Sequence, residues 1–462
     1  VLPNHHMTYH LASRFGWPQW GRMQLERSVA EADPLEALLD GRYRDPDTGA
    51  SIGVKTRALA IEPSLAGSEA ELVVRLGFGR TLAVLSDPDT HAALGARIER
   101  ALASRFTVEP ILLPRTPEPD AETVERVRAA SASADSLIAV GSGTINDLAK
   151  YAGALDGKPY AVFATAPSMN GFTSLTASIT VEGHKKTLPA QAPAGAFFDL
   201  EVLAAAPARL IRAGVGDSIC RATAQWDWLL SHRLLGTPYR ELPFALLAGD
   251  EPDLIAHAGD LLGGDLEVMR RLVRTLVLSG FGTAIVGSSA PASQAEHLVS
   301  HYLDMLGPAD RPIVFHGEQI AVTTLSMARL QEAMLEGPPP VLTADSATEN
   351  EFITRYGYHL GQSTWTEFAE KRLRAERADE LNHAIAANWQ NFVAEASKIA
   401  LSSARIHAVL TAAGAPTTPE AIHLDRPFYE HALTHAREIR NRYTVLDLAA
   451  ASGRLAGLVP RL

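Results

Sequence analysis

The sequence predicts an α/β domain built on a parallel sheet, followed by an all-helical domain. Between residues 57 and 165, short apolar runs alternate with segments of helical period, which indicates parallel strands with helices on both faces. From about residue 205 the pattern is helical almost to the C-terminus. The chain has 462 residues, enough for two or three domains. We expect an N-terminal extension (1–50), an α/β nucleotide-binding domain (51–205) and a helical domain (206–462).

The elements of the first half follow from the period of their apolar residues. Five apolar runs are predicted to be strands: 57–62, 80–86, 108–114, 136–142 and 160–165. Helical periodicity covers residues 88–106 and 121–133. Residues 166–193 contain too many Ser, Thr, Gly and Pro for a helix, yet they are too apolar for a disordered linker, so we expect an ordered loop.

Composition excludes several kinds of partner and location. The net charge of −11 argues against nucleic acid or an anionic membrane as the main partner. No apolar run approaches the roughly 18 residues of a membrane span, and the start of the chain does not resemble a signal peptide. The single cysteine, Cys220, permits no internal disulfide, so we expect a cytoplasmic protein in which this thiol is buried rather than nucleophilic. The large helical part is compatible with a homo-oligomer.

A nucleotide-binding turn is predicted at "GSGTIND", residues 141–147. Gly141 and Gly143 would let the backbone approach a pyrophosphate, and the helix that follows would offer free N–H groups. Asn146 occupies the position of the third fingerprint glycine, so a plain tight turn remains an alternative. Upstream, Asp87 follows a strand. It either binds the adenosine ribose, which would favour NAD over NADP, or only caps the next helix.

Three stretches of the second half contain residues that could bind a metal. Asp217 stands in "AGVGDSIC", His297 and His301 are four residues apart, and His316 follows the apolar run "RPIVF". One carboxylate and two imidazoles suit a divalent ion such as Zn, Ni, Fe or Mn. The alternatives are that Asp217 is an N-cap at a helix start and that the two histidines lie on a solvated helix face.

Together these stretches resemble the sn-glycerol-1-phosphate dehydrogenase family, which belongs with iron-type alcohol dehydrogenases, glycerol dehydrogenases and dehydroquinate synthases. The resemblance extends from about residue 50 to the closing "REIRNRYTVLDLAAASGRL", and it implies a dehydroquinate synthase-like fold. The ordered motifs that carry it are "GSGTINDLAKY", "TAPSMNGFTS", "GDSICRATAQWDW", "AEHLVSH" and "HGEQIAV".

The resemblance implies three groups of site residues. Asp217, His297 and His316 would hold one divalent metal ion (Zn, Ni or Fe) and serve catalysis. Asn170, Asp217, His301 and Lys185 would face the substrate. NAD or NADP would contact Asp87, Gly141, Ser142, Gly143, Thr144, Ile145, Asp147, Thr165, Ala166, Pro167, Ser168 and Ser174.

One position departs from the family pattern. The family commonly has an Asp two residues after "TAPS", where this chain has Asn170. An amide removes a charge beside the reacting carbon and adds a donor. Either Asn170 supplies the same hydrogen bonding, or the substrate differs. Nearby, Lys185 and Lys186 could supply positive charge for a phosphate or could belong to a solvated hairpin.

The reaction that these features imply is hydride transfer between NAD(P)H and dihydroxyacetone phosphate, which would give sn-glycerol 1-phosphate. The metal would act as a Lewis acid on the carbonyl oxygen. A glycerol or polyol dehydrogenase acting on an unphosphorylated or different small ketone is the first alternative. A sugar-phosphate cyclase is less favoured, because "GFTSLTAS" replaces the Gly-Gly-Lys-Thr segment of such enzymes.

Overall fold

The computed structural model describes residues 33–181 and 184–462, apart from the His184 side chain. Its centre in the N-terminal half is a six-stranded parallel sheet, in the order β3-β10-β7-β6-β4-β5, as the alternation of strands and helices predicted. The strands are β3 (Ala58–Glu62), β4 (Thr81–Ser86), β5 (Thr107–Leu112), β6 (Ser136–Gly141), β7 (Tyr160–Ala164) and β10 (Gly195–Asp199).

Both faces of this sheet are buried because its strand residues alternate between two helical layers. In β4, Leu82 and Val84 pack with α2 (Glu69–Val74) and α4 (Ala96–Leu102). Ala83 and Leu85 point to the opposite face, which α5 (Ala121–Ala130) and α6 (Gly143–Asp156) cover. The predicted helix over 88–106 is present, with α3 (Pro88–Thr90) and a π-helical turn (His91–Gly95) before α4.

Two strand regions escaped the sequence analysis. Residues 166–193 are not simply a loop, because they contain the antiparallel hairpin of β8 (Thr176–Val181) and β9 (His184–Pro189). β10 was also missed, although its "GAFFD" segment lies between β3 and β7. Before the sheet, α1 (Pro34–Leu39) and a small hairpin of β1 (Tyr43–Arg44) and β2 (Ser51–Ile52) precede β3.

The second half is helical throughout its described residues, as predicted. None of its helices is long and apolar enough to cross a bilayer, nor is any other helix in the described ranges. The helices are α7 (Leu200–Ala204), α8 (Ala208–Ile219), α9 (Arg221–Leu235), α10 (Leu242–Ala245), α11 (Glu251–His257), α12 (Leu266–Val286), α13 (Ala295–Leu306), α14 (His316–Leu335), α15 (Glu349–Tyr356), α16 (Tyr358–Lys371), α17 (Ala375–Ile399), α18 (Ser403–Ala412), α19 (Arg426–His435), α20 (Val445–Ala451) and α21 (Leu455–Leu458), with short 3-10 turns between some of them.

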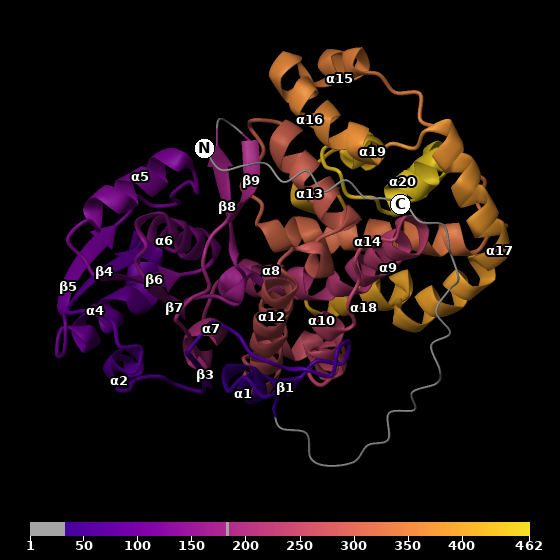
Figure 1. Ribbon diagram of the computed structural model, residues 1–462. Coiled ribbons are helices and arrows are strands. Elements are labelled where there is room, and N and C mark those ends of the chain that lie inside the picture. Colours follow the sequence, from indigo (N-terminus) through magenta and orange to yellow (C-terminus); the bar gives the residue numbers. More distant parts are fainter. Residues whose placement is uncertain (1–32, 182–183) are drawn as a thin grey trace.

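Two apolar cores position the functional residues. The larger core joins one face of the sheet to α8 and α12, and a second core lies wholly within the helical part, around α9, α13, α14 and α17. Figure 1 shows the sheet and its helices on one side, the helical part on the other, and the β8–β9 hairpin rising between them. The division into domains at about residues 50 and 205 stays a prediction.

Candidate active site

Two glycines of α8 place Asp217 between the α/β half and α14. A Cβ atom at Gly214 would lie 1.8 Å from the Pro167 carbonyl oxygen. A Cβ atom at Gly216 would lie 2.0 Å from the Gly317 carbonyl oxygen. Only glycine therefore allows this helix to approach both backbones so closely. Asp217 stands near the C-terminal end of α8, so its interpretation as an N-cap at a helix start was wrong.

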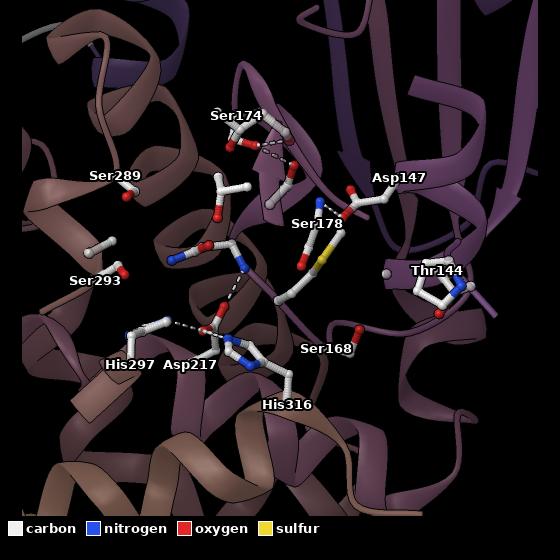
Figure 2. Close-up of a pocket in the computed structure, with 18 of the residues that line it drawn as sticks. Thr144, Asp147, Ser168, Ser174, Ser178, Asp217, Ser289, Ser293, His297 and His316 are labelled. Carbon is white, nitrogen blue, oxygen red and sulfur yellow. Dashed lines mark hydrogen bonds and ion pairs between the residues drawn. The ribbon is translucent and has the colours of Figure 1, made fainter. Parts of the chain in front are cut away.

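Asp217, His297 and His316 converge around one unsatisfied oxygen. Asp217 Oδ1 is buried without a hydrogen-bond partner and lies 3.9 Å from Nε2 of each histidine. The ligand atoms of the three residues all lie within 4.8 Å of one another, and Figure 2 shows the side chains gathered at one wall of the cleft. A buried carboxylate oxygen facing two imidazole nitrogens fits a divalent cation. These residues therefore suit the implied metal.

Burial shifts the pKa values of His316 and Asp217 in opposite directions. Burial lowers the pKa of His316 well below its usual value, and the neighbouring His297 and Lys185 lower it further. Burial raises the pKa of Asp217, while His297 and the N–H of Asn170 oppose that rise. A neutral imidazole has a free lone pair, and a cation would compensate the buried carboxylate.

Glu296 is a functional candidate that the sequence analysis missed. Its fully buried carboxylate contacts His297 Nδ1 at 2.9 Å through Oε1. The same oxygen accepts the Gln294 N–H, and Oε2 accepts from the Thr223 hydroxyl at 3.2 Å. A carboxylate on the far nitrogen orients an imidazole ligand and leaves its Nε2 free for the metal. In the sequence, only its position directly before His297 could have indicated that Glu296 has a role at the site.

His301 lies beside the three ligand candidates without belonging to them. Its ring centroid is 6.4 Å from that of His297 and 6.3 Å from that of His316. Burial lowers its pKa well below the usual value, with Arg440 and Lys185 contributing, and its Nδ1 has no partner among the described residues. Both His297 and His301 are buried, so the solvated-face interpretation was wrong.

Cys220 is buried one turn beyond Asp217, as expected for a structural thiol. Its Sγ donates to the Asp217 carbonyl oxygen at 3.1 Å. Burial raises the pKa of the thiol well above its usual value. In the absence of a metal ion, the thiol therefore stays protonated at neutral pH.

A cleft of about 280 Å³ joins this group to the nucleotide turn. Figure 2 shows Thr144 and Asp147 across the cleft from Asp217 and His297. The four predicted substrate residues, Asn170, Asp217, His301 and Lys185, all line it. Of the predicted cofactor residues, Ser142, Gly143, Thr144, Asp147, Ser168 and Ser174 line it, whereas Asp87, Gly141, Ile145, Thr165, Ala166 and Pro167 do not.

Several polar residues of the cleft had no distinguishing signal in the sequence. They come from the hairpin, from α12 and from the segment before α13, which only the tertiary fold brings together. These residues are Thr176, Ser178, Thr187, Thr283, Ser289 and Ser293.

The turn between β6 and α6 has the geometry that a phosphate site needs. Ser142 is the N-cap of α6 and Gly143 its first residue, so the first-turn N–H groups of α6 open toward the cleft. A Cβ atom at Gly141 would lie 2.5 Å from the Ile145 Cβ. Position 141 therefore requires glycine, because a larger residue would collide with Ile145. The partial positive charge of the helix start favours an anion there.

A buried lysine of α6, which the sequence analysis did not single out, fixes the loop that carries Ser174. Lys150 is fully buried, and its Nζ donates to the Gly171 and Thr176 carbonyl oxygens at 2.5 and 3.0 Å. It also donates to Ser174 Oγ at 3.1 Å and lies 3.7 Å from Asp147 Oδ1. Lys150 therefore connects the nucleotide helix to the loop on the other side of the cleft.

Asp87 directly follows β4, the strand beside β6, and it caps the following helix. Its Oδ1 accepts the N–H groups of Asp89 and Thr90 at 2.9 and 2.8 Å. The capping interpretation is thus confirmed. A contact with the adenosine ribose stays a prediction.

Lys185 reaches the cleft from β9, whereas Lys186 is exposed. Lys185 Nζ lies 2.8 Å from Asp304 Oδ2 on α13. Both lysines belong to a hairpin, as the alternative had it, but only Lys186 is solvated, whereas Lys185 is half-buried on the wall of the cleft.

The fold and this site define a class of protein, the metal-containing NAD(P)-dependent alcohol dehydrogenases. The family model for iron-containing alcohol dehydrogenase matches residues 60–207. Among solved structures, butanol dehydrogenase from Thermotoga maritima superposes with a TM-score of 0.57 at 13% identity, covering 88% of this chain and 97% of that one. Glycerol dehydrogenase from Schizosaccharomyces pombe gives 0.55 at 16% identity, with 86% and 88% covered. These likenesses confirm the dehydroquinate synthase-like fold.

Sequence relatives narrow the class to one family. Glycerol-1-phosphate dehydrogenase [NAD(P)+] of Thermococcus kodakarensis is 33% identical over 298 residues, which cover 64% of this chain and 84% of that protein. The Bacillus licheniformis enzyme of the same name is 26% identical over 407 residues, with 87% and 90% covered. The chain belongs to the glycerol-1-phosphate dehydrogenase family. This confirms the predicted family, enzyme class and types of cofactor.

Proposed function

We propose that the protein catalyses reversible hydride transfer between NAD(P)H and dihydroxyacetone phosphate, with sn-glycerol 1-phosphate as the product. One observation carries this proposal. The unsatisfied Asp217 Oδ1, facing His297 and His316, lines the same cleft as the start of α6 and Lys185. A metal site for the substrate carbonyl, a cation for its phosphate group and a helix start for the pyrophosphate of the cofactor thus line one cleft.

Asp217, His297 and His316 would hold the metal, which when bound supplies Lewis acidity toward a carbonyl oxygen. The chain prepares this site through hydrogen bonds to the ligands. The Asn170 N–H holds Asp217 Oδ2 at 2.6 Å, so the other oxygen remains free. Glu296 holds His297 through Nδ1. Asp217 and His297 are therefore oriented before any cation arrives.

The first turn of α6 would bind the pyrophosphate of the dinucleotide through Ser142, Gly143 and Thr144. NAD(P)H, when bound, supplies the hydride. Ser168 and Ser174 line the cleft between α6 and Asp217, where the nicotinamide must lie to reach the carbonyl carbon. Lys150 fixes Ser174 there through the bond from its ammonium group.

Lys185 and His301 would receive the substrate phosphate. Lys185 Nζ is charged and hydrogen-bonded to Asp304, so a phosphate would share or replace that carboxylate as its partner. His301 has a buried Nδ1 without a partner among the described residues and can offer one ring N–H while neutral. The substrate class is therefore a small phosphorylated ketone or its alcohol.

Two further proposals concern the protein as a whole. The lone buried cysteine supports a cytoplasmic location. Self-association of the helical part is also proposed, and sedimentation of the metal-loaded protein would test it.

The test of the proposed function is NADH oxidation by the metal-loaded protein, with dihydroxyacetone phosphate and dihydroxyacetone offered at equal concentration. We expect strong preference for the phosphorylated ketone and loss of activity on chelation. Preference for the bare ketone would instead assign the protein to the polyol dehydrogenases. Turnover of neither, with cofactor and metal bound, would contradict the proposed substrate.

A further inference from the structure

A second cavity, of about 540 Å³, lies in the helical part on the other side of one short segment from the active-site cleft. That segment contains the 3-10 turn Ala290–Ala292, before α13. Ser289 and Ser293 line the active-site cleft, whereas Ser288, Ala290 and Gln294 line the second cavity. Figure 2 shows Ser289 and Ser293 on the active-site side. The two cavities are therefore separate spaces with a common wall.

Arg442 gives the second cavity a cation whose side chain is hydrogen-bonded to no carboxylate among the described residues. It lines the cavity and donates from Nη1 to the carbonyl oxygen and hydroxyl of Ser293, and from Nη2 to Ser289 Oγ at 3.2 Å. Within residues 33–181 and 184–462, all its hydrogen-bond partners are neutral. Burial and the nearby Arg440 lower its pKa to about 10, while Glu296 opposes the shift. The guanidinium remains charged at neutral pH.

The other charged residues of this wall are already paired or exposed. Lys371 Nζ lies 2.9 Å from an Asp447 carboxylate oxygen and donates to the Arg442 carbonyl oxygen at 2.7 Å. Glu370 is exposed at the rim, where it accepts from Asn441. Arg442 is thus the charge that an incoming anion would meet.

Two buried polar atoms of the same wall also lack partners. The Tyr443 hydroxyl and Gln294 Oε1 have none among the described residues, although Gln294 Nε2 donates to the Ala290 carbonyl oxygen. Tyr443 is 4% exposed and Gln294 is 1% exposed. Such groups cost stability unless something satisfies them. Trp228, Leu235 and Val286 supply apolar surface in the same cavity.

We propose that this cavity binds a small oxyanion, a carboxylate or a phosphate group, which Arg442 and the Tyr443 hydroxyl hold. Arg442 supplies the charge and N–H groups, and Tyr443 donates one hydrogen bond. Gln294 Oε1 accepts from a hydroxyl or N–H group of the same ligand, and the apolar surface covers its carbon skeleton. The proposal does not rest on the proposed function, because Arg442, Tyr443 and Gln294 line the second cavity and not the active-site cleft.

The test measures anion binding to the full-length, metal-loaded protein by calorimetry and by the shift in melting temperature. The probes are inorganic phosphate and acetate, each compared with chloride at constant ionic strength. Four proteins are needed: wild type, Arg442→Gln, Tyr443→Phe and His301→Gln. The last variant removes an anion-binding group from the active site and leaves the second cavity intact.

We expect phosphate, acetate or both to bind wild type at the second cavity. His301→Gln should keep this part of the anion binding and lose only binding at the active site, whereas Arg442→Gln should lose binding at the second cavity. Tyr443→Phe should bind about tenfold more weakly, yet melt no lower than wild type without anion, because it removes an unpaired buried hydroxyl. This combination separates binding from a structural role. Binding of neither anion to wild type would overturn the proposal, as would loss of all anion binding in His301→Gln or unchanged binding in both Arg442→Gln and Tyr443→Phe.

Discussion

The backbone N–H of Asn170 donates a 2.6 Å hydrogen bond to Asp217 Oδ2. The Asn170 side chain points elsewhere, donating from Nδ2 to Ser279 Oγ at 3.3 Å. The residue that departs from the family pattern therefore holds the central carboxylate through its main chain. This contact does not depend on whether the side chain is an amide or an acid.

Restoring the family residue with Asn170→Asp should change the metal-free protein more than the metal-loaded one. A second carboxylate beside buried Asp217 adds like-charge repulsion, which a bound divalent cation relieves. We expect a lower melting temperature in chelator and a larger gain on metal addition than in wild type. Melting curves with and without metal measure both. Asn170→Ala is the control, and equal metal-free melting of the two variants would contradict the prediction.

Glu296→Gln should weaken metal binding without unfolding the protein. The substitution keeps an acceptor near His297 Nδ1 but removes the charge that raises the basicity of the imidazole. Loss of such an outer partner typically costs about 10–100-fold in metal affinity. Competition with a metal-binding dye measures the metal affinity of each variant. Thr223→Val removes the 3.2 Å contact to the other oxygen of Glu296 and the 3.0 Å bond to the Cys220 carbonyl oxygen, and it should have the smaller effect.

Lys185→Met should raise the KM for dihydroxyacetone phosphate and leave turnover of dihydroxyacetone unchanged. A charge-assisted bond to phosphate is lost, which corresponds to roughly a tenfold effect or more. Lys186→Met is a matched control, because Lys186 is the next residue of the same strand but is exposed outside the cleft. Equal effects of the two substitutions would argue that only the overall charge matters.

Gly214→Ala should destabilise the protein and disturb the loop at Pro167. The new methyl group would lie 1.8 Å from the Pro167 carbonyl oxygen, so either the helix or the loop must move. We expect a loss of about 1–3 kcal/mol in the free energy of unfolding, measured with urea. Gly249→Ala should be nearly neutral, because nothing lies within 4 Å of its Cβ position.

Acid should destabilise the helical core through Glu438. This carboxylate lies 2.5 Å from both Arg355 Nη1 and the Tyr356 hydroxyl and 3.0 Å from His435 Nδ1. Burial alone would raise its pKa, but hydrogen bonds from His435 and Tyr356 and the charge of Arg355 lower it below the usual 4.5. Its stabilising contribution is therefore complete above pH 4.5 and is lost as the pH falls through the lower folded-state pKa.

The variant Glu438→Gln isolates that contribution. At neutral pH it should be less stable than wild type, and the difference should shrink below about pH 4.5, by at most ~1.4 kcal/mol per pH unit for one group. Urea unfolding across this range measures the difference. If the difference in the free energy of unfolding stayed constant down to strong acid, Glu438 would stabilise the protein through packing and not through its charge.

The sequence by itself determined the class of fold and the kinds of chemistry. Short apolar runs identified five of the six strands of the sheet, because both faces of each strand had to be buried. β10 escaped because "GAFFD" is short and begins at a glycine. β8 and β9 escaped because hydroxyl-rich residues suit a loop and a hairpin equally well. The glycine turn predicted which residues would bind the nucleotide, and the family resemblance predicted which residues would bind the metal.

Only the tertiary structure decided which of those residues meet. Asp217, His297 and His316 come from three helices, and no local pattern can report a distance between them. Burial is also a property of the packed molecule. It decided against a solvated face for His297 and revealed Glu296 and Lys150. The position of Asp217 near the end of α8 decided against an N-cap role, and the second cavity revealed Arg442. Local sequence sets what each side chain can do, whereas packing sets which partners and how much water it has.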